Sequence, residues 1–155
     1  MAVHGLADTQ PLRRFLQACV DEPGIDANIA HGRLRSVALS AMSYTTGRAL
    51  TFVQGTPDTP TWERAHGIAV RAKLELDHVI ASAALPILFP AVRIGDEFCG
   101  DGSVRQTAPL APAIHLGAKR VIAISNRAPF RSPTEAPANA EYPTTAQGAP
   151  RGSSR

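Results

Sequence analysis

The chain has 155 residues, of which 44% are hydrophobic, enough for one globular domain with its own core. Its net charge is +3, but four of the 16 basic and two of the 13 acidic residues lie in the last thirty positions, so the remainder is close to neutral. A nearly neutral body with 5% aromatic residues lacks the basic surface and stacking groups of a nucleic-acid-binding protein. We therefore expect no nucleic acid partner.

Cysteine usage and hydropathy indicate the compartment. Cys19 and Cys99 are far apart and form no C-x-x-C spacing, so the sequence predicts neither a disulfide scaffold nor a zinc site. The N-terminus lacks the basic and apolar regions of a secretory signal. The longest apolar run, residues 79–92, contains Pro86 and Pro90 and is too short to span a bilayer. We expect a cytoplasmic protein without a transmembrane segment.

The N-terminal part of the chain predicts one helix followed by a β-hairpin. Apolar residues recur at helical spacing over residues 11–20, and the Asp-Glu-Pro-Gly sequence at 21–24 is expected to close this helix. Residues 34–42 alternate between apolar and polar side chains, which is typical of a half-buried strand. A turn at 45–48 then leads to the returning strand at 49–53.

The middle of the chain predicts two helices and a second hairpin. Residues 62–72 predict the first helix. Apolar residues on one face predict the second at 74–85, and Pro86 ends it because proline has no N–H donor and restricts the residue before it. The strands of the hairpin are expected at residues 91–94 and 97–99.

The C-terminal part predicts a helix, a buried strand and a tail. The helix at 109–116 ends at Gly117, and the fully apolar run at 121–124 is typical of a strand buried on both faces. Helix, short loop and buried strand together predict an α/β layered fold with some parallel sheet. From residue 126 the chain holds five prolines and no isoleucine or valine, so we expect 126–155 to be a disordered tail.

Residues 98–103, Phe-Cys-Gly-Asp-Gly-Ser, place a single carboxylate between a short strand and an apolar helix. Taken alone, Asp-Gly fits a structural turn, because glycine accepts positive φ and aspartate bonds its own backbone. In open α/β folds, however, turns at the edge of the sheet hold ligands. The glycines beside Asp101 would leave its carboxylate open to a small partner such as a serine hydroxyl.

Two segments resemble motifs of the patatin-like phospholipase family. Residues 76–90, Leu-Asp-His-Val-Ile-Ala-Ser-Ala-Ala-Leu-Pro-Ile-Leu-Phe-Pro, resemble the family's AS.A.P..F.P stretch. Residues 100–103, Gly-Asp-Gly-Ser, followed by Ala-Pro-Leu at 108–110, resemble its D-G-[GA] motif and the proline-led helix after it. The two motifs at this spacing are more specific than either alone, and the similarity extends over residues 11–125.

The resemblance implies a three-layer α/β/α fold and a Ser–Asp dyad that hydrolyses lipid acyl esters. By position, Asp101 would be the general base and Gly102 would let the turn close. Ser103 stands where the motif usually has glycine or alanine. The substrate would be a lipid acyl ester, which implies peripheral contact with membranes, and we expect no cofactor.

The 155 residues contain no G-x-S-x-G nucleophile motif and no G-G-x-[RK] oxyanion loop. In the family both elements belong to the N-terminal half of the domain. We therefore expect residues 1–125 to be the C-terminal portion of an incomplete patatin-like domain, inactive by itself, with the N-terminal half as its partner. The alternatives are a non-catalytic interaction module and one half of an enzyme completed by another chain.

Other candidate residues favour structural roles. Ser82 lies in a predicted helix without a neighbouring base, and Glu75-x-x-His78 lacks the second such helix that a di-metal site needs, so packing and a solvated helix face are expected. His115 is expected at the surface near the end of its helix. Because no metal-binding histidine spacing, dinucleotide fingerprint or P-loop lysine occurs, we expect no metal and no nucleotide.

Overall fold

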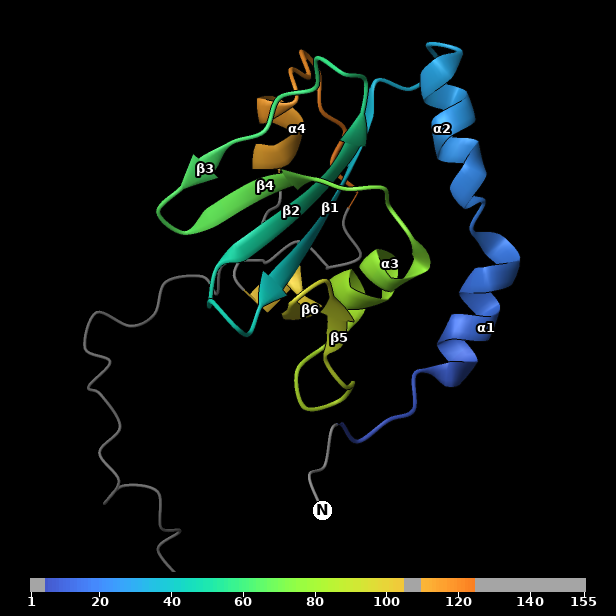
Figure 1. Ribbon diagram of the computed structural model, residues 1–155, viewed down its shortest axis with the longest axis vertical. Helices are drawn as coiled ribbons and strands as arrows, with labels where there is room; N and C mark the ends of the chain where they lie inside the picture. Colours follow the sequence, from blue (N-terminus) through green and yellow to red (C-terminus); the bar gives the residue numbers. More distant parts are fainter. Residues whose placement is uncertain (1–4, 105–109, 125–155) are drawn as a thin grey trace, which may run out of the picture. The chain divides into compact units, whose positions relative to one another are not determined.

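The computed structural model describes residues 5–104 and 110–124. Within them, a mixed six-stranded sheet has the order β3-β4-β2-β1-β6-β5 and is flanked by helices (Figure 1). The strands are β1 (Ser36–Ser43), β2 (Ala49–Gly55), β3 (Glu63–Arg64), β4 (Gly67–Arg71), β5 (Val92–Ile94) and β6 (Glu97–Asp101). The helices are α1 (Gln10–Cys19), α2 (Glu22–Ala30), α3 (Leu76–Ala83) and α4 (Ala111–His115), with a 3₁₀ turn, η1 (Gly102–Val104). The α/β class is confirmed.

β1 and β2 form an antiparallel hairpin in the middle of the sheet. Gly47 in the connecting turn has a φ of +69°, a backbone region that glycine enters without steric strain. β6 pairs antiparallel with β1 on one side, while β4 pairs parallel with β2 on the other. Both predicted hairpins, at 34–53 and 91–99, are confirmed.

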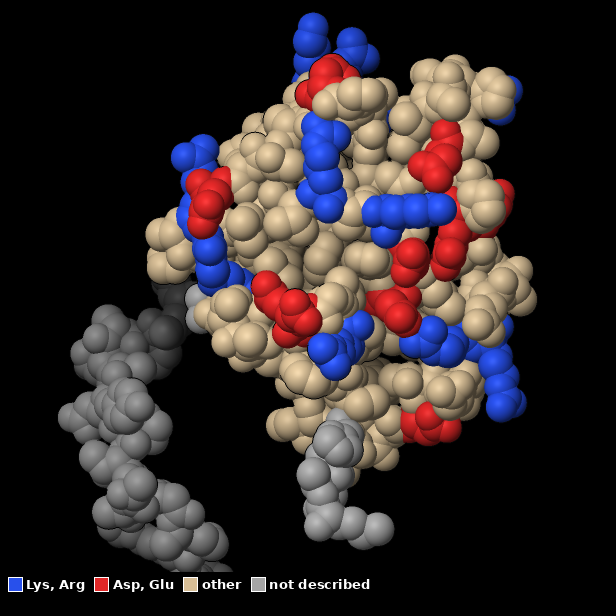
Figure 2. Space-filling view, in the orientation of Figure 1, with Lys and Arg blue, Asp and Glu red and all other residues tan. Residues whose placement is uncertain are grey.

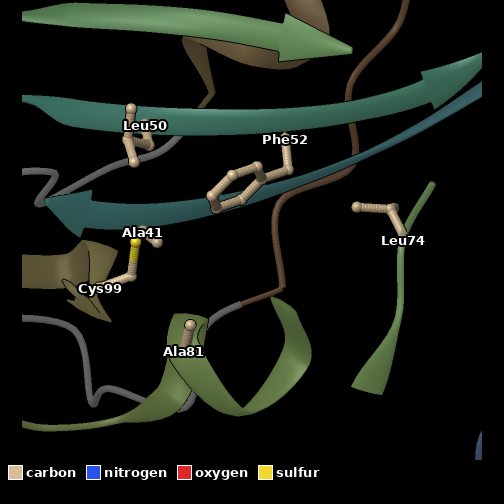
Figure 3. Close-up of a cluster of buried hydrophobic side chains, with 6 residues drawn as sticks. All are labelled: Ala41, Leu50, Phe52, Leu74, Ala81 and Cys99. Carbon is tan, nitrogen blue, oxygen red and sulfur yellow. The ribbon is translucent and has the colours of Figure 1, made fainter. Parts of the chain in front are cut away.

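One face of the sheet carries the hydrophobic core. Its fully buried members come from β1, β2, β6, α3 and the segment before α3, and they are Ala41, Leu50, Phe52, Leu74, Ala81 and Cys99 (Figure 3). α3 lies against β1, β5 and β6 on this face. Ala41 and Ala81 are completely buried, and their small side chains let the helix pack closely on the sheet. The helix predicted within 74–85 is confirmed.

The opposite face of β2 is buried as well. Ala49 and Val53 alternate with the core residues of this strand and are 8% and 1% exposed. The β3–β4 register, continued by one residue, places Trp62 beside Ala69 on this second face. The ring of His115 on α4 stacks on Trp62, with the ring centroids 4.7 Å apart. Helices therefore lie on both sides of the sheet, as in a layered α/β/α arrangement.

The sequence did not predict α2, which begins at Glu22 within the segment expected only to end the preceding helix. Asp21 accepts a hydrogen bond from the backbone N–H of Gly24, which caps the helix. Pro23 lies in the first turn, where its missing N–H costs nothing because that group would have no partner within the helix. The Asp-Glu-Pro-Gly sequence thus both follows the predicted helix α1 and starts another.

Polar contacts tie α2 to the sheet and to α3. Glu22 accepts a hydrogen bond from the backbone N–H of Leu76, at 2.7 Å. Gln54 on β2 donates its side-chain amide to Asp26 and accepts from the backbone N–H of Leu74, at 2.7 Å. Gln54 is buried, so its side-chain amide cannot bond to water. These two bonds give its N–H and its oxygen protein partners and so avoid the free-energy cost of an unpaired buried polar group.

Two predicted elements are wrong. Residues 62–72 form β3 and β4 rather than a helix, because Ile68 and Val70 belong to a strand that pairs along β2. The run at 121–124 forms no strand with the described sheet, and Ile122 is 89% exposed. Apolar composition alone therefore did not suffice to predict a strand. The predicted tail, 126–155, lies outside the described residues.

The loop between α3 and β5 contains a strained residue. Ile87 has a φ of +71°, unlike every other non-glycine residue in the described part of the chain. β-branched side chains rarely adopt this region because their Cβ substituents crowd the backbone. Two backbone hydrogen bonds hold the loop, from Leu6 to Ile87 at 3.0 Å and from Ala7 to Leu88 at 2.7 Å. Since the Ile87 side chain is 80% exposed, burial of that side chain does not account for the strain.

We expect Ile87→Gly to keep or raise the stability of the fold. Relief of the positive φ contributes about 1–2 kcal/mol, and the greater freedom of glycine in the unfolded chain offsets about 0.5–1 kcal/mol of it. Urea unfolding of Ile87→Gly should therefore give a free energy of unfolding equal to or above that of the wild type. Ile87→Ala, which keeps the strained backbone, is the matched control and should be less stable than the glycine variant.

Candidate functional site

Asp101 is the last residue of β6, immediately before the η1 turn. Its backbone pairs with Ala41 on β1, and its N–H donates to the carbonyl oxygen of Ala84 after α3, at 2.9 Å. The residue is 9% exposed. The backbone of Asp101 is therefore held between the central strand and the residue after α3, and the residue as a whole is nearly buried.

Ser103 satisfies both oxygens of the Asp101 carboxylate. Its backbone N–H donates to Oδ1 at 2.8 Å, and its hydroxyl donates to Oδ2 at 2.7 Å. None of the ion pairs between described residues involves Asp101. Each carboxylate oxygen has two lone pairs, so the group retains the capacity to accept a further hydrogen bond. The carboxylate is thus oriented by neutral donors and is not locked into an ion pair there.

The glycines on either side of Asp101 are required by close approach rather than by turn geometry. A Cβ on Gly102 would lie 2.6 Å from the backbone carbonyl oxygen of Ser40, and one on Gly100 would lie 2.0 Å from the Tyr44 hydroxyl. Neither glycine has a positive φ. A turn does follow Asp101, since η1 begins at Gly102 and the Asp101 carboxylate accepts from the backbone N–H of Ser103, but glycine is favoured here by the close neighbours and not by a positive φ.

Tyr44 is a member of the site that the sequence did not indicate. It follows β1 directly, and its hydroxyl lies over Gly100. Burial raises the pKa of Tyr44, and the negative charge of Asp101 adds to this rise because it disfavours a second anion nearby. Tyr44 also lines a hollow of about 370 Å³ together with Gly5, Leu6, Pro86, Ile87, Phe89 and Ala91. A lone tyrosine after a strand carries no motif that could have revealed this.

Comparison with known families gives one match. A family model described as patatin-like phospholipase matches residues 1–114. The chain belongs to this family. The matched segment includes Asp101, Gly102 and Ser103, and it covers well over half of the chain. No curated protein and no solved structure gave a match.

The patatin-like family comprises lipid acyl hydrolases. The mixed sheet with α3 on one side and α4 on the other is the α/β patatin-like fold, present here as a partial domain. Among residues 5–104 and 110–124, no helix is both long and apolar enough to cross a membrane.

The remaining candidates in this patatin-like chain have structural roles. Ser82 donates its hydroxyl to the carbonyl oxygen of Val79 at 3.2 Å, as expected of a packing residue. His78 is 7% exposed rather than solvated, because its ring packs edge-on against Phe52 and its Nδ1 accepts from the backbone N–H of Glu75. His115 is exposed at the end of α4, as expected.

Cys99 lies two residues before Asp101 on β6 and is completely buried. Burial raises the pKa of its thiol to about 11, and the Glu97 carboxylate adds to the rise. At neutral pH the thiol is therefore protonated and unreactive, which makes it a packing residue of the core cluster. Cys19 is exposed, so the two thiols differ in accessibility.

We expect Gly102→Ala to destabilise the fold by about 1–3 kcal/mol, because the new methyl group meets backbone atoms that cannot rotate away. Gly100→Ala is the matched variant, since its methyl group meets the end of a movable side chain. In double-mutant cycles measured by urea unfolding, Tyr44→Ala should rescue Gly100→Ala but not Gly102→Ala. Equal behaviour of the two glycine variants would contradict this account of the strand end.

The two thiols should react at very different rates with an aromatic disulfide reagent. In the native protein Cys19 should be modified quickly. Cys99 should be modified slowly, because with a pKa of about 11 only about one Cys99 thiol in a thousand is ionised at pH 8 and its sulfur is shielded from the reagent. In a Cys19→Ser variant, the remaining thiol should react only as fast as the core opens. Rapid modification of Cys99 under native conditions would contradict the complete burial of this side chain on β6.

Proposed function

We propose that Asp101 is the general base of a patatin-like Ser–Asp dyad and that its serine is supplied from outside these 155 residues. The observation that carries the proposal is a single, nearly buried carboxylate at a strand end, inside the matched family segment and hydrogen-bonded by neutral donors alone among the described residues. Cys19 and Cys99 are both free, which supports a reducing, cytoplasmic setting.

The proposed chemistry follows from the charge and position of Asp101. The carboxylate accepts the proton of the incoming serine hydroxyl while the serine oxygen attacks the carbonyl carbon of a lipid acyl ester. The protonated carboxylate returns this proton to the lipid oxygen, which leaves as an alcohol; Asp101 then accepts a proton from water, whose oxygen attacks the acyl-serine, and the acyl group leaves as a carboxylic acid while the serine oxygen regains the proton. Donors for the oxyanion would come with the serine-bearing segment, whose glycine-rich loop has no counterpart in this sequence.

Ser103 fits this scheme as a positioning residue. Its two hydrogen bonds hold the carboxylate plane, so that a free lone pair can face the incoming hydroxyl. Ser103 itself is exposed and its hydroxyl is the one bonded to Asp101, so it is the residue to test if the isolated chain shows activity.

A second function, an interaction module or one half of a split enzyme, is favoured by the apolar run at 121–124. Val121, Ile122 and Ile124 are 42%, 89% and 95% exposed. Exposed apolar residues in sequence are typical of surfaces that another segment covers. The serine-bearing segment of the first proposal would be such a segment. Both functions would then explain why these apolar side chains are exposed in the isolated chain.

We expect the purified chain to show no hydrolysis of p-nitrophenyl butyrate above background, because loss of the nucleophile lowers the rate of serine hydrolases roughly 10⁶-fold. Fusion to a patatin-like N-terminal segment that carries G-x-S-x-G should create activity. In that fusion, Asp101→Asn should lower kcat roughly 10²- to 10⁴-fold. Asp96→Asn, a change at an exposed aspartate on the same hairpin, is the matched control and should leave kcat unchanged.

Two results would overturn this assignment. A fusion that keeps its kcat with Asp101→Asn would show that Asp101 is not the general base. Hydrolysis by the chain alone that is lost in Ser103→Ala would place the nucleophile within these residues instead.

A further inference from the structure

A hollow of about 270 Å³ lies on the core face of the sheet and is lined by residues of β2, β4 and the β5–β6 hairpin. Two charged residues, Arg48 and Glu97, line it, and we call it the Arg48–Glu97 hollow. Thr46 adds a polar group, and the lining includes neither Asp101 nor Tyr44. The rest of the lining is apolar and consists of Leu50, Phe52, Ile68, Val70 and Ile94.

The pairing of β2 with β4 produces the apolar floor of the hollow. The parallel register sets Leu50 beside Ile68 and Phe52 beside Val70. Alternate residues of a strand share one face, so these four side chains project from the same side of the sheet. Figure 3 shows Leu50 and Phe52 on this side, which is also the side of α3. Such a floor favours an apolar body in any molecule that fills the hollow.

Arg48 offers an unused hydrogen-bond donor at this hollow. Its Nη2 donates to Oε1 of Glu63 and to the carbonyl oxygen of Arg64, both at 2.9 Å, which fixes the guanidinium. Its Nε is buried, and within residues 5–104 and 110–124 it has no hydrogen-bond partner. Because its charge is already paired with Glu63, Arg48 requires an acceptor here rather than a second anion.

Glu97 offers an unused acceptor at the same hollow. It begins β6 and pairs with Ile94 across the hairpin, so the two side chains lie on one face. Its Oε2 is buried, and no residue in the described part of the chain bonds to it. Leaving a buried polar atom unpaired is costly, so each of the two atoms points to a ligand group of complementary polarity.

The opposite needs of these two atoms limit the charge of a ligand. An anion would bond to Arg48 but would be repelled by the Glu97 carboxylate, and a cation would bond to Glu97 but would be repelled by the guanidinium. A primary amide is neutral, and it has both an accepting oxygen and a donating NH₂ group. Water offers the same groups, but buried waters make about three hydrogen bonds and an apolar floor provides none.

The size of the hollow suits a ring or short chain that carries such an amide. An apolar cavity of roughly 150 Å³ is enough to hold benzene. The hollow of about 270 Å³ therefore has room for a ring and an amide group. Thr46 is exposed, which gives the hollow an edge at the surface. Figure 2 shows basic and acidic side chains interspersed over the visible face, so the surface in this view favours neither anions nor cations.

We propose that the Arg48–Glu97 hollow binds a small uncharged molecule in which a primary amide is joined to an apolar ring or chain. The amide oxygen accepts from the Nε–H of Arg48, and the amide N–H donates to Oε2 of Glu97. The apolar body lies on the floor formed by β2 and β4. This binding needs neither Asp101 nor the serine-bearing segment, so it is independent of the proposed function.

Four probes of similar size test the class of ligand. Benzamide carries the amide, benzoate is its anionic counterpart, benzylammonium is its cationic counterpart, and toluene has no polar group. In ligand-detected NMR titrations of the full chain at pH 7, benzamide should bind at least about tenfold more tightly than each of the others, because only benzamide satisfies both atoms without repulsion. Toluene binding as tight as that of benzamide, or no benzamide binding at all, would overturn the proposal.

Removing one charge at a time should change the selectivity in opposite directions. Glu97→Gln removes the repulsion of an anion, so the affinity for benzoate relative to benzamide should rise about tenfold. Arg48→Met removes the repulsion of a cation, so the relative affinity for benzylammonium should rise by a similar factor. Asp96→Asn, next to Glu97 but exposed, is the matched control and should change neither ratio. Unchanged ratios in both test variants would overturn the proposal, whereas a purely structural role would shift all affinities together.

Filling the hollow locates the bound molecule. Ile68→Phe and Ile94→Phe enlarge side chains on two sides of the lining, and each should lower the affinity for benzamide at least about tenfold. Cooperative unfolding in urea shows which of the two variants keeps the fold. Ile114→Phe is the matched control, since Ile114 is 63% exposed on α4 and is not part of the lining. Undiminished binding in a folded Ile68→Phe or Ile94→Phe variant would place the molecule elsewhere and overturn the proposal.

The competing occupant is the serine-bearing segment. If the hollow were the docking surface of that segment, the fusion would lose the benzamide binding that the chain alone shows. That result would assign the hollow to the segment and overturn the proposal. Failure of the fusion to hydrolyse esters would remove the proposed function but would leave benzamide binding unchanged, so the two failures are distinguishable.

Discussion

The close pairing of β6 with the central strand β1 is the contact on which the candidate site depends. Asp101 is opposite Ala41, and Gly102 comes so near the backbone of Ser40 that no side chain fits between them. Small residues at these positions let a strand end approach the middle of the sheet and place a carboxylate there. The helix α3 then covers the pair, since Ala81 and Ala41 are both completely buried.

This packing has an electrostatic consequence. A carboxylate that is mostly removed from water needs hydrogen-bond donors, and Ser103 provides two of them from the next turn. The same negative charge contributes to the raised pKa of Tyr44. Residues that are separate in the sequence thus form one local environment, which is the kind of setting in which a patatin-like enzyme could use an aspartate as a base.

The sequence predicted the parts of the fold that local patterns determine. Both hairpins were recognisable because strand alternation flanks turns with glycine at positive φ, namely Gly47 and Gly95. Helix α3 was recognisable from its apolar face and the proline after it. α2 was missed because Asp-Glu-Pro-Gly is equally suited to end one helix and to cap the next.

The order of residues alone was therefore enough to identify Asp101 as a candidate, because a family motif is recognised from residue types at a given spacing. The tertiary structure decided the rest. Residues 62–72 contain strands because β2 offers an edge to pair with, and among the residues of the run at 121–124 Ile122 is 89% exposed. The near-burial of Asp101 and the place of Tyr44 likewise depend on contacts between distant segments, which no local pattern encodes.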